Sequence, residues 1–413
     1  MPAAPSLDQL QERLAAEQEA TGNFAPSLSA PTAAAFLADW LGKLPETAAL
    51  PAAERALIAQ RLHQRMFGLG PLQPLLNDPA ITEVMVNGPQ QVLAERDGRL
   101  VATEVKFESD AEVRNLINRL VAAVGRRLDE AQPLVDARLP DGSRINAVIA
   151  PLSRVGTVLT IRRFPPEPWT LPRLMARGLA PAAAGEFLRR AVVARLNILV
   201  SGSTGSGKTA LLNALAGAIP VAERLVTIED TAEIMLGHPH WIPLEARPPN
   251  MEGAGEVSIR TLLKNALRMR PDRIIIGEVR GGEALDLLQA MNTGHQGSLT
   301  TIHANGPAEA LLRLETMALL GDVVLPLAAV RAQVKAAVQL VVQLARCPGG
   351  ARRLVAIAEL LPGAAEPEHS PYQLQFLWQY HAAHDRWQGG GRRSYYAEQF
   401  NAAGVPVEDI VNS

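Results

Sequence analysis

The sequence contains little cysteine and few aromatic residues. Cys347 is the only cysteine among 413 residues, which excludes a disulfide framework and a four-cysteine zinc site and fits a reducing cytosol. Phe, Trp and Tyr together make up 4% of the chain, and the formal net charge is −2. Proteins that bind single-stranded nucleic acid use basic grooves with aromatic stacking platforms, so we expect no direct nucleic-acid partner.

A long uninterrupted apolar run is missing as well. The most apolar late stretch, Leu325–Cys347, is broken by Arg331, Lys335 and Arg346, which predicts a helix and a strand in a core rather than a membrane span. The N-terminal residues show no basic segment followed by an apolar run, so we expect no signal peptide. A cytoplasmic protein that reaches a membrane only through partners is predicted.

A phosphate-binding loop is the most informative motif that is present. Residues Gly202–Thr209 match the pattern G-x-x-x-x-G-K-[ST] at every fixed position, between a strand-like and a helix-like segment. Such a loop surrounds phosphates with backbone N–H groups at a helix N-terminus, while Lys208 reaches the β- and γ-phosphates and Thr209 binds Mg²⁺. The sequence therefore predicts ATP binding by Gly202, Ser203, Thr204, Gly205, Ser206, Gly207, Lys208, Thr209 and Ala210.

The distribution of apolar residues, turns and prolines predicts an α/β protein of several parts. Alternating strands and helices after the linker imply a mostly parallel sheet with helices on both faces. The predicted parts are a mobile N-terminus (1–30), a short helical bundle (31–67), a small α+β domain (68–163), a proline-rich linker (164–172), an α/β nucleotide-binding domain (173–362) and a C-terminal appendage (363–413).

Two acidic segments follow strands of the predicted parallel sheet. The apolar run Ile274–Ile276 ends in Gly277 and Glu278, as a Walker-B strand would, except that glycine stands where Asp usually supports the metal. Glu278 is predicted to orient water and to lie near the metal; the alternative is an exposed acid at a strand end. Glu229 and Glu233 follow another strand, where they supply the missing carboxylate or simply cap the next helix.

Histidines and arginines complete the predicted site. His295 and His303 flank a Ser/Thr-rich strand and are interpreted as a γ-phosphate sensor; either alone would normally be a structural residue. A guanidinium stabilises transition-state charge in phosphoryl transfer, and Arg144 and Arg162 are the first choices because they lie on strands of the α+β domain. The other candidates are Arg138, Arg163, Arg268, Arg270, Arg273 and Arg280.

Together these motifs resemble the ATPases of type II secretion, type IV secretion and type IV pili. The likeness is carried by Gly202–Thr209 (Walker A), Thr227–Glu233 (aspartate box), Arg270–Ala284 (Walker B) and Thr293–Asn305 (histidine box). Three further segments, Gly68–Leu72, Glu83–Gly88 and Leu139–Asn146, are similar to the N-terminal domain of that family.

The likeness is closest to the CpaF type, which drives assembly of tight-adherence (Tad/Flp) pili. It implies a RecA-like P-loop domain behind a PAS-like N-terminal domain, and a homo-hexamer that hydrolyses ATP with Mg²⁺ and moves an inner-membrane platform protein. The resemblance also implies nucleotide roles for Lys208, Thr209, Glu229, Glu233, Glu278, His295, His303, Arg144 and Arg162. The chain lacks the four-cysteine zinc module of typical type II exporters and the Ala-Ile-Arg-Asn-Leu-like segment of retraction motors.

Alternative functions stay open at this point. A type IV secretion or conjugation ATPase shares the same motifs. A RecA-like DNA translocase or helicase belongs to a different class and would be stimulated strongly by DNA. Gly277 leaves open a nucleotide-binding scaffold without turnover, and a P-loop kinase is a weaker alternative because no acceptor site is recognisable.

Overall fold

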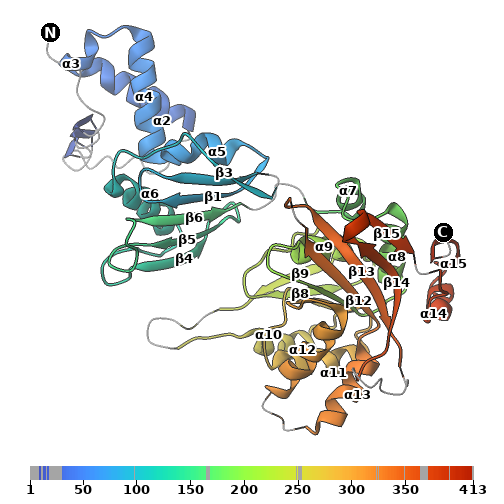
Figure 1. Ribbon diagram of the computed structural model, residues 1–413. Coiled ribbons are helices and arrows are strands. Elements are labelled where there is room, and N and C mark those ends of the chain that lie inside the picture. The colour runs from blue at the N-terminus through green and yellow to red at the C-terminus, as the bar shows by residue number, and fades with distance from the viewer. Residues whose placement is uncertain are drawn as a thin grey trace. The chain divides into compact units, whose positions relative to one another are not determined.

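The computed structural model contains two compact units. Figure 1 shows these units, Met1–Pro165 and Pro166–Ser413. The described residues are 9–10, 13–14, 16–17, 30–96, 98–163, 168–247, 249, 254–321, 323, 325–347, 349–362, 371–389 and 391–411. The predicted mobile segment 1–30 falls almost entirely outside them, as do residues 164–167 of the predicted linker. Among the described helices, none has the length and apolarity needed to cross a membrane.

A small helical subdomain opens the first unit. Its buried side chains include Leu37 and Leu41 on the first long helix and Leu62 on the other, so each helix buries one apolar stripe against its neighbour. The helices are α2 (Ala30–Lys43), α3 (Pro45–Ala48) and α4 (Ala52–Phe67). Sequence periodicity predicted two helices over residues 31–67, and the short α3 is the addition.

The rest of the first unit is an antiparallel sheet with a helix packed on one face. The six strands run in the order β3-β2-β1-β6-β5-β4. Helix α6 buries Val113, Ile117 and Val121 against the sheet, and the Ser109 hydroxyl caps it by accepting the Glu112 N–H at 3.2 Å. The elements are η1 (Gly70–Leu72), α5 (Gln73–Asn77), β1 (Ile81–Asn87), β2 (Val92–Arg96), β3 (Arg99–Ala102), α6 (Asp110–Ala122), β4 (Leu134–Arg138), β5 (Arg144–Val148) and β6 (Val158–Arg162).

The second unit is built around a nine-stranded sheet in the order β15-β14-β13-β12-β7-β11-β10-β8-β9. All neighbouring strands from β12 to β9 are parallel, and those from β12 to β15 are antiparallel. This confirms the predicted α/β class and mostly parallel sheet. The strands are β7 (Ile198–Gly202), β8 (Leu225–Glu229), β9 (Trp241–Glu245), β10 (Arg273–Ile276), β11 (Leu299–Ile302), β12 (Leu340–Arg346), β13 (Arg352–Leu360), β14 (Leu374–His381) and β15 (Arg386–Gly389).

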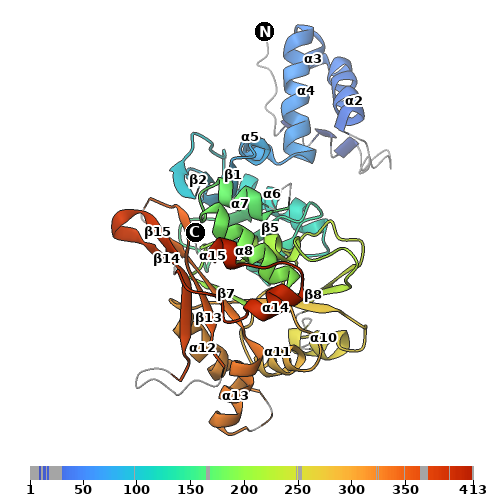
Figure 2. The ribbon, with the colours of Figure 1, turned by 90° about the vertical axis from the view of Figure 1, so that its right-hand side faces the viewer.

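Strand alternation divides the apolar residues of this sheet between two cores. In β10, Ile275 packs in one core, while Ile274 and Ile276 pack in the other. Figures 1 and 2 show α7, α8 and α9 over one face and α10 to α13 over the other, which accounts for the two cores. These helices are α7 (Leu171–Ala176), α8 (Ala182–Val193), α9 (Lys208–Ala216), α10 (Ile259–Ala266), α11 (Glu283–Asn292), α12 (Pro307–Leu319) and α13 (Leu327–Ala337).

The C-terminal segment is part of the fold of the second unit. The sequence-based prediction of a C-terminal appendage over 363–413 is corrected accordingly. Strands β14 and β15 extend the sheet, and Phe400 on α14 is fully buried in the first core. Buried Glu359 on β13 accepts hydrogen bonds from the Ser394 hydroxyl and the Tyr395 N–H, which ties the segment down. The segment has many large apolar residues, such as Trp378 and Phe400, but no local pattern in the sequence shows where they dock. The remaining elements are η2 (Ala382–His384), α14 (Ala397–Ala402) and α15 (Glu408–Val411).

Candidate functional site: a nucleotide site at the carboxyl edge of the parallel sheet

The phosphate-binding loop joins β7, at the centre of the sheet, to the N-terminus of α9. Gly202 lies so close to its neighbours that an added Cβ would be 2.5 Å from Ser206 Oγ and 2.6 Å from the Leu344 carbonyl oxygen. Gly207 has φ +98°, a left-handed conformation that favours glycine. In the described part of the chain, the N–H groups of Gly205 and Gly207 donate to no protein acceptor. The loop thus has the free donors and the shape that phosphate binding requires.

Lys208 is held in a polar network that starts inside the loop. Its Nζ lies 3.1 Å from the Ser203 carbonyl oxygen and 3.4 Å from both ring nitrogens of His303. His303 follows β11, and its Nε2 lies 2.8 Å from Glu278 Oε1. Since β11 lies next to both β7 and β10, the sheet order explains why these three residues meet.

Partial burial and the charges nearby hold His303 in its neutral form. Burial lowers the pKa of His303, the Lys208 charge lowers it further, and Glu278 opposes both effects. A neutral imidazole can accept a hydrogen bond from Lys208 on one nitrogen while donating to Glu278 from the other. Arg280 continues the network, because its Nη2 lies 3.0 Å from Glu278 Oε2 and its Nε lies 3.6 Å from Asp230 Oδ2.

The structure explains the glycine that replaces the usual Walker-B aspartate. A Cβ on Gly277 would lie 2.9 Å from Glu229 Cγ, so the side chain of Glu229 occupies the space that residue 277 leaves open. Glu229 is 3% exposed, and its Oε1 accepts the N–H groups of Glu233 at 3.0 Å and Ile234 at 3.1 Å. Burial raises the pKa of Glu229 to about 7, even though the two backbone hydrogen bonds lower it. This carboxyl group is therefore poised to exchange a proton near neutral pH.

The donor set at this edge fits a magnesium–nucleotide. Thr209, on the first turn of α9, is half-buried beside Lys208, and the carboxylates of Glu278 and Glu229 supply the hard oxygen ligands that suit Mg²⁺ or its water shell. Glu233 lies half-buried after β8, with its N–H bound to Glu229. Of the predicted catalytic residues in the second unit, five thus lie at this edge of the sheet, namely Lys208, Glu229, Glu233, Glu278 and His303, whereas His295 and the arginine candidate Arg273 do not.

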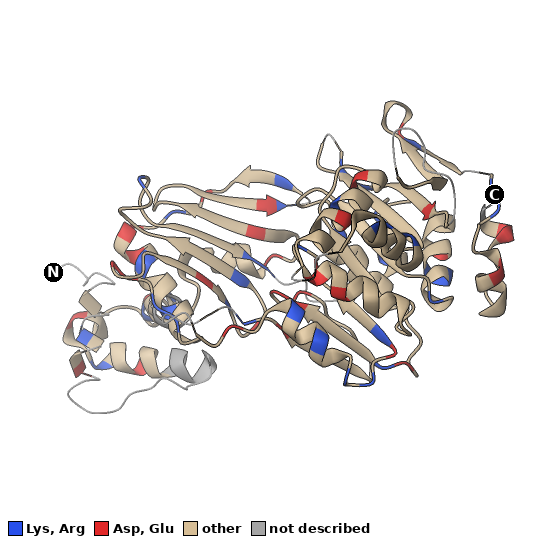
Figure 3. Cartoon of the chain, turned by 90° about the horizontal axis from the view of Figure 1, so that it is seen from below, with Lys and Arg blue, Asp and Glu red and all other residues tan. Residues whose placement is uncertain are grey.

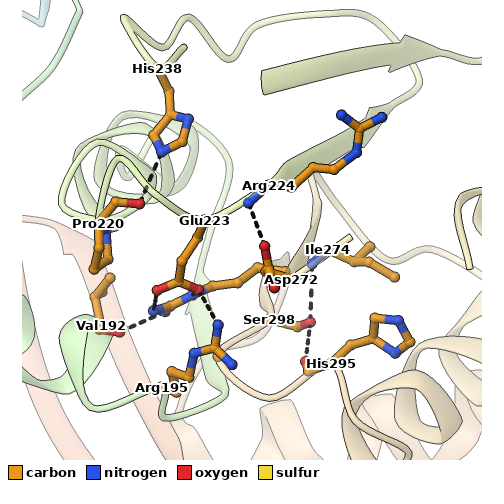
Figure 4. Close-up of polar contacts among 12 residues, drawn as sticks. Val192, Arg195, Pro220, Glu223, Arg224, His238, Asp272, Ile274, His295 and Ser298 are labelled. Carbon is orange, nitrogen blue, oxygen red and sulfur yellow. Dashed lines mark hydrogen bonds and ion pairs between the residues drawn. The ribbon is translucent and has the colours of Figure 1, made fainter. Parts of the chain in front are cut away.

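His295 lies at the opposite edge. It precedes β11, and the Ser298 hydroxyl donates to its carbonyl oxygen at 2.7 Å (Figure 4). Within the described residues, His295 Nδ1 is buried without a hydrogen-bond partner. The two histidines that flank β11 are thus brought to different ends of the strand, and only His303 contacts Lys208.

The opposite edge is held by a buried ion pair. Arg273, another of the arginine candidates, has a fully buried side chain, and its Nε and Nη2 donate to Glu223 at 2.8 and 2.7 Å. Its Nη1 donates to the Val192 carbonyl oxygen at 2.6 Å, and Arg195 donates to Glu223 as well (Figure 4). Burial alone would raise the pKa of Glu223, but the two arginines outweigh it and lower that pKa. These contacts identify Arg273 as a structural residue.

In the first unit, three predicted arginines form a row across the sheet. Arg138, Arg144 and Arg162 are register partners on β4, β5 and β6. Arg144 and Arg162 alternate with the buried residues Ile145 and Ile161, which places both arginines on the face away from α6. Figure 3 shows basic and acidic residues interspersed in both units, so this row is a local feature.

Sequence reasoning missed two arginines beside the phosphate loop. Arg352 Nε donates to the Gly205 carbonyl oxygen at 3.0 Å, and Arg346 is its register partner on β12. Neither belongs to a recognisable motif. The only signal in the sequence was the hairpin-like Gly349-Gly350 turn after the apolar β12 strand. That this hairpin lies beside the phosphate loop follows from the pairing of β12 with β7, which the sequence does not reveal.

Comparisons with known proteins agree with this geometry. Residues 66–392 match the family model described as "Type II/IV secretion system protein". A Mycobacterium tuberculosis protein whose given name provisionally assigns it to conjugal transfer is 44% identical over 305 residues, covering 72% of this chain and 86% of that protein. The type IV secretion system protein PtlH homolog of Bordetella bronchiseptica is 38% identical over 325 residues, covering 70% of this chain and 93% of that protein.

A solved structure shows the same fold. The X-ray structure of the Yersinia pseudotuberculosis ATPase DotB superposes with a TM-score of 0.51 at 18% identity, covering 70% of this chain and 77% of that one. At this identity the likeness concerns the fold alone, which supports a RecA-like arrangement of the second unit.

Proposed function

Because the chain belongs to the type II/IV secretion system ATPases, we propose that it hydrolyses Mg²⁺-bound ATP at the carboxyl edge of its nine-stranded sheet and powers a type IV secretion or conjugation machine. The observation that carries this proposal is the network that joins Lys208 of the phosphate loop to His303 and Glu278. Lys208 begins α9, whereas Glu278 and His303 follow β10 and β11, and the three side chains meet at the loop.

The contacts support separate roles for the acidic residues. Glu278 orients the attacking water, since its carboxylate lies beside His303 and within reach of the loop lysine network. Glu229 takes the place of the missing Walker-B aspartate, and its pKa of about 7 suits it to accept a proton during turnover. Glu233 supports Glu229 through its backbone N–H.

The histidines and the first-unit arginines keep their sequence-based roles as proposals. His303 reports the presence of a γ-phosphate to Glu278, because it contacts both Lys208 and that carboxylate. For His295 to act in the same sensor, β11 has to transmit the γ-phosphate signal from His303 to its other end. The row that contains Arg144 and Arg162 places arginines opposite each other on neighbouring strands, which suits binding of phosphate charge.

The names of the relatives favour the conjugation or type IV secretion alternative over the Tad pilus hypothesis. Among the relatives described above, one is named for conjugal transfer and one for type IV secretion. Assembly of a Tad pilus rests on the motif likeness alone. A homo-hexamer at the cytoplasmic face of the inner membrane, acting on membrane platform partners, is proposed from the family resemblance.

A turnover assay tests the enzymatic part of the proposal. The purified full chain should hydrolyse ATP, and Glu278→Gln should lower kcat by about a thousandfold because it removes the group that orients water. The affinity for ATP, measured by titration calorimetry, should stay within about threefold. Strong stimulation by DNA, or wild-type binding without turnover, would instead support the translocase or scaffold alternatives.

A complementation experiment tests the cellular part. The source cell is deleted for this gene and complemented with the wild type or with Glu278→Gln, and DNA or protein transfer is measured beside surface pili. Loss of transfer with normal pili, restored only by the wild type, supports the proposal. Loss of pili with normal transfer would return the pilus hypothesis to first place.

A further inference from the structure

A β-hairpin brings two arginines to the phosphate loop. Strand β12 runs parallel to β7 with Leu344 opposite Gly202, the first residue of the loop. The chain continues past that point to Arg346, turns, and returns at Arg352, its cross-strand partner. Both arginines therefore lie beyond the end of β7, where the loop leaves the sheet.

The contacts place both side chains against the middle of the loop. Arg352 Nε donates to the Gly205 carbonyl oxygen at 3.0 Å, and Arg352 Cδ lies 3.5 Å from the position of a Cβ on Gly207. Arg346 Nη1 lies 3.9 Å from the position of a Cβ on Gly205. Gly205 and Gly207 are also the residues whose N–H groups donate to no acceptor in the described part of the chain.

The chemistry of arginine fits this position. A guanidinium carries five N–H donors in a plane, so one side chain can donate to a loop carbonyl and to a phosphate oxygen together. A carbonyl oxygen that turned toward a phosphate would repel it, and the hydrogen bond from Arg352 fixes the Gly205 carbonyl. The N–H groups of the loop are then held in the orientation that an anion requires.

We propose that Arg346 and Arg352 form a second cationic wall of the nucleotide site, opposite the Lys208 network. Arg352 is a positioning residue that holds the loop through the Gly205 carbonyl, and Arg346 donates to the nucleotide phosphates. This inference rests on the proposed ATP-binding function, but it concerns residues outside the four family motifs.

Arg353 provides a control on the same strand. Strand alternation directs it to the other face, where it donates to the Gly178 carbonyl oxygen and its guanidinium carbon lies 5.5 Å from the centre of the Trp387 ring. Arg353→Gln removes the same charge one residue further along β13 than Arg352→Gln. It therefore corrects for the general loss of positive charge and for changes in the stability of β13.

The test measures ATP and ADP binding to the full chain by titration calorimetry, with thermal unfolding of every variant. Arg346→Gln and Arg352→Gln should each weaken ATP binding by about tenfold, as expected when a charge-assisted hydrogen bond is lost. Arg352→Lys should recover part of that loss, since an ammonium group can still donate to the carbonyl. In hydrolysis, KM should rise while kcat changes by less than about threefold.

The controls separate this inference from the function on which it depends. If ATP binding depends on Lys208 but Arg346→Gln and Arg352→Gln bind ATP as tightly as Arg353→Gln, the second cationic wall is wrong and the proposed function stands. If the wild type binds no ATP, or Lys208→Ala binds it equally well, the proposed function fails and the wall fails with it. A fall in kcat at unchanged ATP affinity would likewise overturn the inference.

Discussion

The two edges of the parallel sheet use the same kinds of side chain for different purposes. At the amino edge, Arg273 is fully buried, and its Nε, Nη1 and Nη2 all donate to protein acceptors. Two of these hydrogen bonds go to Glu223, which closes the arrangement. At the carboxyl edge, Lys208 and Glu278 meet across His303, and the His303 and Glu278 side chains keep 30% and 20% exposure. A closed ionic network stabilises the sheet, whereas a partly exposed one is available to a ligand.

The difference also appears in the pKa values of part-buried Glu223 and buried Glu229. Glu223 is compensated by two arginines, and its pKa is lowered. In the described part of the chain, Glu229 accepts hydrogen bonds only from backbone donors, and burial raises its pKa to about 7. The comparison teaches that burial alone does not mark a functional acid; Glu229 is distinguished by burial without a compensating cation together with its position at the carboxyl edge of the sheet.

The largest expected effect is on stability at the amino edge. Arg273→Met should lower the free energy of unfolding by about 3–5 kcal/mol, because it leaves the part-buried Glu223 carboxylate and the Val192 carbonyl short of a donor. Chemical denaturation measures it. The control is Arg195→Met, whose side chain is 40% exposed and which should cost less than about 1 kcal/mol. Equal losses in the two variants would contradict a structural role specific to Arg273.

A second prediction concerns Glu229 and pH. Its pKa is raised from 4.5 to about 7. Between these two pH values the folded protein therefore keeps a proton on Glu229 that the unfolded chain has released. Its contribution to stability is present below pH 4.5 and is lost as the pH rises to about 7, a change of about 3 kcal/mol. Glu229→Gln removes this titration and should gain stability relative to the wild type by most of that amount between pH 5 and pH 8.

Denaturation of both proteins across that pH range measures the gain. Because other groups titrate equally in the two proteins, the difference isolates residue 229. Hydrolysis by Glu229→Gln should fall even where the variant is more stable. A pH-independent stability difference would show that Glu229 is not the uncompensated acid described above.

The third and smallest effect separates the two histidines of one strand. His303→Ala should lower kcat by about tenfold to a hundredfold, since it releases both Lys208 and Glu278 from their positions. His295→Ala, at the other edge, should change kcat by less than about threefold. Steady-state hydrolysis of ATP measures both. Equal losses would instead support the sequence-based hypothesis that the strand relays the γ-phosphate signal to His295.

Much of the fold and part of the site could be predicted from the sequence. The loop at Gly202–Thr209 and the apolar run before Glu278 carry strong local patterns, and three consecutive isoleucines are typical of a strand such as β10 that is buried on both faces. Strand β9 was not predicted, because Pro243 lies within it; proline is tolerated there because β9 is an edge strand. Local patterns thus predicted those elements whose residue types favour the secondary structure that they adopt.

The missing parts depend on which strands become neighbours. The space above Gly277 is filled by Glu229 only because β8 pairs with β10, and Arg352 reaches Gly205 only because β12 pairs with β7. No local pattern encodes those pairings. His295 is a different case, because it and His303 flank β11 and the strand itself places them at opposite edges of the sheet.

The most direct test of the account is the affinity of the full chain for Mg²⁺-bound ATP in the wild type and in Lys208→Ala, measured by titration calorimetry at constant ionic strength. If the nucleotide binds at the carboxyl edge, Lys208→Ala should weaken binding by about a hundredfold, because it removes the buried cation from the phosphate loop. Unchanged affinity in Lys208→Ala, with the protein still folded, would contradict the assignment of this edge as the nucleotide site.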